Sequence, residues 1–253
     1  MSVLNHPLER SLRSVVAANN ARIRSADPIV DNPRSVAGMA GHELLASRFD
    51  SIRAEWDAFE ASQGRLPRIE QVLGEHQGND GAWRAGLLVA HGRPVRPLAD
   101  RFPLTVAALQ WYPGLLSALW SVLEPGTELP EHAGGNAGVL RYHLGVATND
   151  DSALRVADTV VPYREGAAVL FDDTVPHAAW NRGSDRRVTL FCEVLRPLPA
   201  PASWGNRAVQ RLLALDRRYR LAPTRAAEWH DALNPPRPPA AAPERHALPR
   251  PSV

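Results

Sequence analysis

The sequence predicts a mainly β fold, a barrel or jelly roll, with helices before and after it. From residue 105 to 195, short apolar or alternating runs are separated by turn sequences such as Pro125-Gly126 and Asn149-Asp150-Asp151. Many short strands joined by regular turns are typical of all-β barrels and jelly rolls. On both sides of this region, apolar residues recur every three to four positions, which indicates amphipathic helices.

The N-terminal part is predicted to be helical over residues 8–25 and 42–62. In the second stretch the apolar residues follow the helical period: Leu44, Leu45, Phe49, Ile52, Trp56 and Phe59. Residues 67–74 are predicted to form a short helix that begins at Pro67. Residues 76–103 are rich in glycine, proline and arginine and are predicted to be loop with short turns. We therefore expect residues 1–102 to form a helical and loop region packed on the barrel.

The predicted barrel occupies residues 103–200. Its expected strands are Thr105–Tyr112, Ala118–Leu123, Val139–Val146, Leu154–Val161, Ala167–Phe171, Ala178–Trp180 and Val188–Leu195. Residues 201–233 are expected to form a C-terminal helical segment, most clearly over 204–220. The proline-rich tail, residues 234–253, is expected to stay disordered. A chain of 253 residues can hold one such domain with helical additions.

The composition argues against several classes of protein. The chain is 44% hydrophobic and 22% charged, which is ordinary for a globular protein. It has no apolar run near the roughly 20 residues of a membrane span. Its first residues lack the apolar core of a signal peptide. The expected location is therefore the cytoplasm, with no membrane partner.

The charge and the cysteine content argue against nucleic-acid binding and against a disulfide-bonded fold. All 29 basic residues are arginines scattered through both halves, and the net charge is only +2. Without a basic stripe and interleaved aromatic residues, nucleic-acid binding is not expected. The single cysteine, Cys192, excludes an intrachain disulfide and is predicted to be an inert residue in a buried strand.

Two histidines and one arginine carry the strongest chemical signal. His132 and His177 are far apart in the sequence, but each lies at the edge of a predicted strand, where a ligand can face the mouth of a barrel. Neutral imidazole suits iron(II), and open coordination positions suit oxygen chemistry. Arg187, ten residues after His177, begins a strand and can make a two-point contact with a carboxylate. Its neighbour Arg186 then faces the other side of the sheet.

Taken singly, these residues are more typical of core, turn or surface salt-bridge positions. Together they point to an oxygenase that depends on iron(II) and 2-oxoglutarate, with the arginine holding the dicarboxylate.

Arg141 and His143 lie two apart on a predicted strand and therefore share a face. Leu140, Tyr142 and Leu144 take the other face. If Arg141 and His143 point into the barrel, they need an anionic partner, because isolated buried charge is unfavourable. A bound dicarboxylate would meet that need, but the strand pattern alone equally allows an outer, solvated face.

Between Pro103 and Pro197, several short stretches of sequence follow one another in an order and spacing that can be compared with those of known families. They are Ser-Val-Leu-Glu-Pro-Gly-Thr, Pro-Glu-His, Leu-Arg-Tyr-His-Leu-Gly, Glu-Gly, Phe-Asp-Asp-Thr-Val-Pro-His-Ala-Ala-Trp-Asn, Arg187-Val188 and Arg196-Pro197. In these pieces the chain resembles the aspartyl/asparaginyl β-hydroxylase family. The resemblance implies a double-stranded β-helix (a jelly-roll, cupin-like fold), iron(II) bound by His132 and His177, and 2-oxoglutarate and O2 as cosubstrates.

The same resemblance assigns further residues. The 2-oxoglutarate contacts of the family map onto Ser121, Arg141, His143 and Arg187, which implies that Arg141 and His143 point inward. Asp172 and Asp173 also match the family. They are expected to be structural residues, and Asp173 is positioned in the sequence to orient a histidine ligand.

Gly134 bears on the substrate. Many 2-oxoglutarate oxygenases carry a carboxylate two residues after the first histidine, and this chain has Gly134 there. Family members that hydroxylate Asp or Asn side chains in peptides also have glycine, whereas the free-proline hydroxylases generally retain the acid. We therefore expect hydroxylation of the β-carbon of an Asp or Asn residue in a peptide or peptide-like substrate. The lipid A hydroxylases of the family bring a membrane anchor that this sequence does not show, so a lipid substrate is expected less.

Two other readings remain open. One is a tailoring oxygenase that acts on a free or carrier-bound amino acid or another small metabolite. The other is a non-catalytic, cupin-like binding protein, with glycine at position 134 marking an inactive metal site. The sequence does not predict the oligomeric state.

Overall fold

A computed structural model describes residues 7–28, 31–74 and 82–235. Its β-strands form two sheets, and within each sheet all neighbouring strands pair antiparallel. The larger sheet has the order β2-β1-β3-β10-β5-β8. Its strands are β1 (Trp83–Ala90), β2 (Arg93–Pro94), β3 (Leu115–Leu123), β5 (Val139–Ala147), β8 (Ala168–Phe171) and β10 (Arg187–Leu195).

The smaller sheet has the order β4-β9-β6-β7, with β4 (Thr127–His132), β9 (His177–Asn181), β6 (Ser152–Val156) and β7 (Thr159–Pro162). Apolar residues of both sheets pack into one cluster between them, including Leu123, Leu154, Phe171 and Ala179. The predicted mainly β, cupin-like jelly roll with helices at both ends is therefore confirmed.

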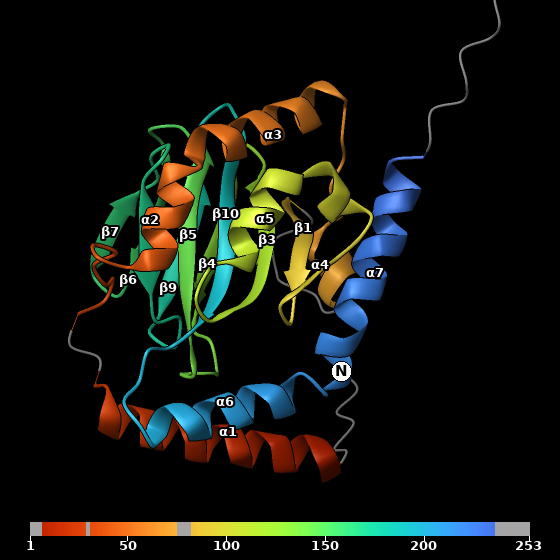
Figure 1. The fold of residues 1–253 in the computed structure, drawn as a ribbon. Coiled ribbons are helices and arrows are strands. Elements are labelled where there is room, and N and C mark those ends of the chain that lie inside the picture. The colour runs from red at the N-terminus through yellow and green to blue at the C-terminus, as the bar shows by residue number, and fades with distance from the viewer. Residues whose placement is uncertain (1–6, 29–30, 75–81, 236–253) are drawn as a thin grey trace, which may run out of the picture.

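The outer face of the larger sheet is covered by helices α2 (Ala40–Ser47), α3 (Phe49–Ala61) and α5 (Pro103–Gln110), and by the 3-10 turn η1 (Leu98–Arg101) (Figure 1). Alternate residues of β3, β5 and β10 point into this layer, because successive side chains of a strand face opposite ways. Trp120 packs there against Trp56 and Phe102, with ring centroids 5.0 and 5.1 Å apart. Cys192 is buried in the same cluster. The intervening residues of β3, β5 and β10 therefore point to the opposite face, toward the smaller sheet.

Four further helices lie at the margins of the barrel. Helix α1 (Pro7–Ala26) packs beside α6 (Ala202–Leu213) below the ends of the strands, and α4 (Ile69–Leu73) packs beside α7 (Arg217–Leu233) (Figure 1). The contact between α1 and α6 is polar: Asn19 donates to the Asn206 side chain at 3.1 Å, and Asn206 donates to the Gly138 carbonyl at 2.7 Å. These two helices are thereby tied to the loop that follows β4.

Several predicted boundaries need correction. The predicted strand Thr105–Tyr112 is wrong: it is helix α5, which begins at Pro103 and buries Val106 and Leu109 at helical spacing. The predicted loop 76–103 is wrong over Trp83–Ala90, which forms β1. This strand has a continuous buried run, Ala85–Val89, because both of its faces are covered, so it shows no alternation. The barrel therefore begins before residue 103.

Other differences are smaller. The predicted helix 42–62 is two helices that meet at Arg48, and the predicted strand Leu154–Val161 is the hairpin of β6 and β7, which turns at Ala157. Strand β4 was not predicted. The predicted helix 8–25 is confirmed as α1, whereas the predicted helix 204–220 is α6 and the start of α7, separated at residues 214–216. The predicted disordered tail lies outside the described residues, apart from Asn234 and Pro235.

Candidate active site

A cavity of about 360 Å³ lies between the two sheets. All six residues singled out from the sequence line it: Ser121, His132, Arg141, His143, His177 and Arg187. They come from β3, β4, β5, β9 and β10, so the jelly roll brings together residues that are up to 66 positions apart in the sequence. Arg141 and His143 face this cavity, while Leu140, Tyr142 and Leu144 pack under the helices on the other face of β5.

His132 and His177 form a facing pair at one end of the cavity. They are paired in the register of β4 and β9, and their ring centroids are 4.2 Å apart. His132 Nδ1 donates to the Pro130 carbonyl at 2.8 Å, and His177 Nδ1 donates to the Val175 carbonyl at 2.9 Å. Because a carbonyl only accepts, each Nδ1 carries the proton, and the lone pair of each neutral ring lies on Nε2.

The His177 ring is buried, and burial lowers the pKa of His177 below its usual 6.5. The neutral form that can bind a metal is thereby favoured at neutral pH. Two imidazoles with a fixed tautomer suit a divalent transition metal. Among the described residues, no group of three or more His, Cys, Asp and Glu side chains is arranged to hold a metal ion. The two histidines are thus a pair of potential ligands without a third His, Cys, Asp or Glu side chain arranged beside them among the described residues.

Asp173 occupies the space beside Gly134. A Cβ atom added at Gly134 would lie 2.5 Å from Asp173 Cγ. The two residues are also joined through their backbones, with Gly134 N donating to the Asp173 carbonyl at 2.7 Å. The Asp173 carboxylate is buried, and its Oδ1 has no hydrogen-bond partner among the described residues. A side chain at position 134 and the present position of Asp173 are therefore incompatible.

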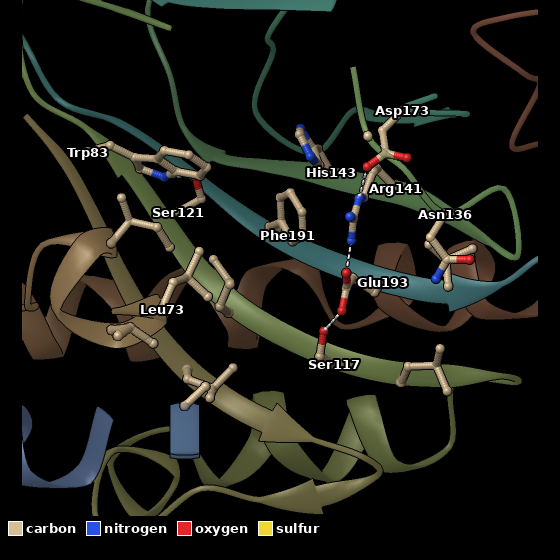
Figure 2. Close-up of a pocket in the computed structure, with 18 of the residues that line it drawn as sticks. Leu73, Trp83, Ser117, Ser121, Asn136, Arg141, His143, Asp173, Phe191 and Glu193 are labelled. Carbon is tan, nitrogen blue, oxygen red and sulfur yellow. Dashed lines mark hydrogen bonds and ion pairs between the residues drawn. The ribbon is translucent and has the colours of Figure 1, made fainter. Parts of the chain in front are cut away.

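Arg141 is neutralised by two carboxylates. Its Nε donates to Asp173 Oδ2 at 2.7 Å, and its Nη1 forms an ion pair with Glu193, which in turn accepts from Ser117. Figure 2 shows this row of side chains along the cavity, with Arg141 between Asp173 and Glu193. Arg141 is therefore a compensated cation.

Arg187 has no such compensation. Its side chain is only 2% exposed, and its Nε has no hydrogen-bond partner among the described residues. Its polar contact is a hydrogen bond from Nη1 to Thr189 Oγ1 at 2.9 Å, and the guanidinium also lies over the Tyr163 ring, 4.7 Å from its centroid. Burial lowers the pKa of Arg187, and Tyr163 opposes that shift only in part. A buried cation without a carboxylate is unfavourable, so this position is built for an anionic ligand.

His143 and Ser121 complete the polar wall near Arg187. His143 Nδ1 shares a hydrogen bond with the Tyr163 hydroxyl at 2.8 Å, while its Nε2 is buried without a partner in the described part of the chain. Burial, aided by the charges of Arg187 and Arg141, keeps the pKa of His143 well below its usual value. Ser121 Oγ accepts from Trp83 Nε1 at 3.0 Å. The wall thus offers donors and a cation to a ligand.

The loop that presents His177 is anchored from outside the barrel. The buried Asp172 carboxylate is gripped by Arg24 of α1, at 2.7 Å, and by Arg196 after β10. Burial alone would raise the pKa of Asp172, but hydrogen bonds from Arg24 and Thr174 lower it to about 2. Asp172 is therefore a structural residue that fixes the start of this loop. Asp173, the next residue, points into the cavity instead.

Most of the rest of the cavity is apolar. It extends from the polar wall to residues of α4, β1 and the α6–α7 region, and we call this part the apolar arm. Its lining includes Ile69, Val72, Leu73, Leu119, Leu213 and Ala222. In Figure 2, Leu73 lies at the lower left, away from Arg141 and His143 in the upper part of the view. The cavity therefore joins a polar, cationic end to a long apolar end.

Sequence reasoning did not single out Tyr163, Glu193 or the apolar arm. Glu193 had one usable signal, since it lies six residues after Arg187 on the same strand and therefore on the same face. Tyr163 follows a hairpin, and the apolar arm is made by five elements, α4, β1, β3, α6 and α7, so neither had a local signal. No helix among the described residues is both long and apolar enough to cross a membrane.

Comparisons with known proteins agree on one family. The family described as aspartyl/asparaginyl β-hydroxylase matches residues 46–197. The chain is 37% identical over 169 residues to an ornithine lipid ester-linked acyl 2-hydroxylase of Rhizobium tropici, covering 65% of this chain and 60% of the relative. It is 28% identical over 127 residues to human aspartyl/asparaginyl β-hydroxylase, covering 48% of this chain and 17% of that protein. The matches thus span less than two thirds of these relatives.

Solved structures with similar topology include a predicted oxalate decarboxylase from Thermotoga maritima, with a TM-score of 0.34 and 14% identity over 47% of this chain and 86% of that one. Another is a cupin domain of a transcriptional regulator from Enterobacter cloacae, with a TM-score of 0.33 and 16% identity over 46% of this chain and 99% of that one.

Proposed function

The chain belongs to the aspartyl/asparaginyl β-hydroxylase family, and from that premise we propose that it is a hydroxylase dependent on iron(II), 2-oxoglutarate and O2. The observation that carries the proposal is the pairing of two features in one cavity. His132 and His177 donate from Nδ1 to backbone carbonyls, which leaves Nε2 as their metal-binding atom, and the buried Arg187 has no carboxylate partner among the described residues. A metal ion and a small dicarboxylate together satisfy both.

The residues present fit these groups. His132 and His177 would hold iron(II) through Nε2, and the buried Asp173 Oδ1, which has no hydrogen-bond partner among the described residues, would place negative charge near them. When bound, iron(II), 2-oxoglutarate and O2 supply the oxidation that converts a C–H bond into C–OH.

Each polar residue of the wall then has a separate task. Arg187, with Ser121, would bind a carboxylate of 2-oxoglutarate, because Arg187 is buried and has no carboxylate partner among the described residues. His143 and Arg141 would help to orient the same molecule. Since Arg141 is already neutralised by Asp173 and Glu193, its part is to position donors rather than to supply net charge. The apolar surroundings exclude water and strengthen these contacts.

Two substrate candidates follow. The first is the β-carbon of an Asp or Asn residue in a peptide, which the family description and glycine at position 134 support. The second is an acyl chain of a lipid, the kind of group named for the Rhizobium relative. The apolar arm favours the second candidate, because a carboxylate or amide side chain placed there would lose its hydrogen bonds to water, whereas an aliphatic chain gains from burial.

Succinate release tests the proposal. The protein is incubated in air with iron(II), 2-oxoglutarate and ascorbate, with Asp- and Asn-containing peptides, with an acylated amino-acid lipid dispersed in detergent, or with neither. Stimulation together with a product heavier by one oxygen atom identifies the substrate class. Slow succinate release that neither addition changes directs the search to free or carrier-bound metabolites. If there is no succinate and no bound iron, the non-catalytic binding protein becomes the better reading.

A further inference from the structure

Folding gathers positive charge on one side of the molecule. Helices α1 (residues 7–26) and α6 (residues 202–213) contain six arginines and one acidic residue, a formal charge of +5, whereas the whole chain carries only +2. These two segments are distant in the sequence, but α1 and α6 lie side by side below the barrel (Figure 1). The arginines that are scattered along the sequence are therefore concentrated in the folded protein.

Helix α6 reverses the usual arrangement of a surface helix. Its buried residues are Asn206 and Gln210, which hydrogen-bond to the loop after β4, whereas a helix on a globular protein normally turns its apolar side inward. Trp204 is 69% exposed, Leu212 39%, and Leu215, just beyond the helix, 68%. Large apolar side chains thus face outward from a helix whose inward face is polar.

Arginines border this apolar surface. Arg207 and Arg211 are exposed, lie within one or two turns of Trp204 and Leu215, and form no ion pair with any residue that the structure describes. Tryptophan and leucine next to arginine are typical of helices that lie in the plane of a membrane interface. We call the surface formed by Trp204, Arg207, Arg211, Leu212 and Leu215 the α6 face.

The α6 face adjoins the route to the active site. A second cavity of about 220 Å³ lies between α6 and the β1–β2 turn, and Arg207 and Arg211 line it. Gln210 and Ala214 line both this cavity and the one that holds the histidines. Arginine guanidinium groups bind phosphate and carboxylate by paired hydrogen bonds. An anionic head group bound by Arg207 and Arg211 can therefore lie beside the apolar arm.

We propose that the α6 face docks the protein on an anionic lipid bilayer, with Trp204, Leu212 and Leu215 in the interface and Arg207 and Arg211 on anionic head groups. The acyl chain of a lipid then enters the apolar arm toward His132 and His177, a step that rests on the proposed hydroxylase function. A bilayer fits better than a nucleic acid, because the exposed aliphatic side chains and the apolar arm have no counterpart in phosphate and base recognition.

Vesicle co-sedimentation of the full chain tests the docking without iron or cosubstrate. The protein is expected to bind vesicles of phosphatidylcholine with phosphatidylglycerol, to bind pure phosphatidylcholine much less, and to lose binding as salt is raised. Arg207→Gln with Arg211→Gln is expected to weaken binding about 30-fold, since each arginine near an anionic surface contributes ~1 kcal/mol. The matched control is Arg48→Gln with Arg164→Gln, two exposed arginines outside this layer, and it should bind like the wild type.

A second variant separates lipid insertion from simple charge attraction. Trp204→Ser with Leu215→Ser keeps the charge and alters only exposed side chains, so the fold should be preserved. It is expected to lower vesicle binding at every salt concentration while leaving binding to a single-stranded RNA oligomer unchanged. Absence of binding to anionic vesicles, equal loss in the Arg48/Arg164 control, or RNA binding stronger than vesicle binding would each overturn the docking proposal.

Activity on detergent-dispersed substrate keeps the two proposals distinct. Vesicle binding without succinate release leaves the docking intact and removes the hydroxylase proposal. Succinate release without vesicle binding does the reverse.

Discussion

Replacing Arg187 with leucine is expected to leave the free protein as stable as the wild type, or more stable, and to abolish its stabilisation by 2-oxoglutarate. The guanidinium is 2% exposed, its pKa is lowered by burial, and it has no carboxylate partner among the described residues. Its loss removes an uncompensated buried charge, so the free protein has little to lose. The liganded protein, in contrast, loses the anchor of the dicarboxylate.

The size of the effect follows from linkage. At a 2-oxoglutarate concentration of about 100 Kd, binding stabilises the wild type by ~2.7 kcal/mol. For a chain of this size, ~1 kcal/mol corresponds to about 2–4 °C, so the wild-type shift in Tm is about 5–11 °C. Loss of a buried charged contact of ~2–4 kcal/mol weakens binding by at least about 30-fold. At the same concentration, the remaining shift is then below about 3 °C.

The assay is thermal unfolding without oxygen, in iron(II), with and without 2-oxoglutarate. Arg186→Leu is the matched control, because Arg186 is the adjacent residue, lies outside the cavity and pairs with Glu124 at 2.8 Å. Arg187→Lys keeps the charge but loses the two-point geometry, so an intermediate shift is expected. An undiminished shift in Arg187→Leu, or a marked loss of stability in its free form, would refute the reasoning.

Three other predictions follow from the same cavity. His132→Ala and His177→Ala are each expected to abolish succinate release without loss of the fold, and full turnover in either would remove that histidine from the metal site. Gly134→Asp is expected to lower the free energy of unfolding by about 1–3 kcal/mol in urea denaturation, because the Cβ of the new side chain would overlap the Asp173 carboxylate. Adding Asp173→Gly to the same chain should restore part of that loss. The free protein is expected to lose stability as pH falls through 6.5, because the pKa values of His143 and His177 are lowered in the folded protein and the unfolded chain then binds more protons. His143→Gln should make the stability less dependent on pH. A urea midpoint that is equal at pH 7.5 and pH 5.5 in the wild type would contradict this prediction.

The resemblance to the family supplied Ser121 and the inward orientation of Arg141 and His143, whereas strand alternation alone predicted only which residues share a face. Alternation fixes which residues share a face, so Arg141 and His143 had to be on one side and Tyr142 on the other. Secondary structure was wrongly predicted where the order of apolar and polar residues does not distinguish a strand from a helix or a loop. Strand β1 is covered on both faces and shows no alternation, and α5 is apolar on most of its surface, so its short sequence resembles a strand.

The contacts that tune the site could not be predicted, because they depend on register and packing. Whether Arg141 or Arg187 has a carboxylate beside it is decided by the pairing of β5 with β10, which places Glu193 opposite Arg141. Likewise, no local pattern reveals that α1 packs on α6, so the +5 charge of these two helices is brought together only in the fold.

Gly134 and Asp173 are best understood as one structural feature. The missing side chain at position 134 leaves room for the Asp173 carboxylate, and the Gly134 amide holds the Asp173 backbone at 2.7 Å. Arg141 then fixes one oxygen of that carboxylate, and the other stays unpartnered among the described residues. The cavity therefore keeps a negative charge near its histidines, supplied from the β8–β9 loop instead of from the strand that carries His132. Glycine at this position is accordingly compatible with the proposed metal site, because the carboxylate it lacks is supplied by Asp173.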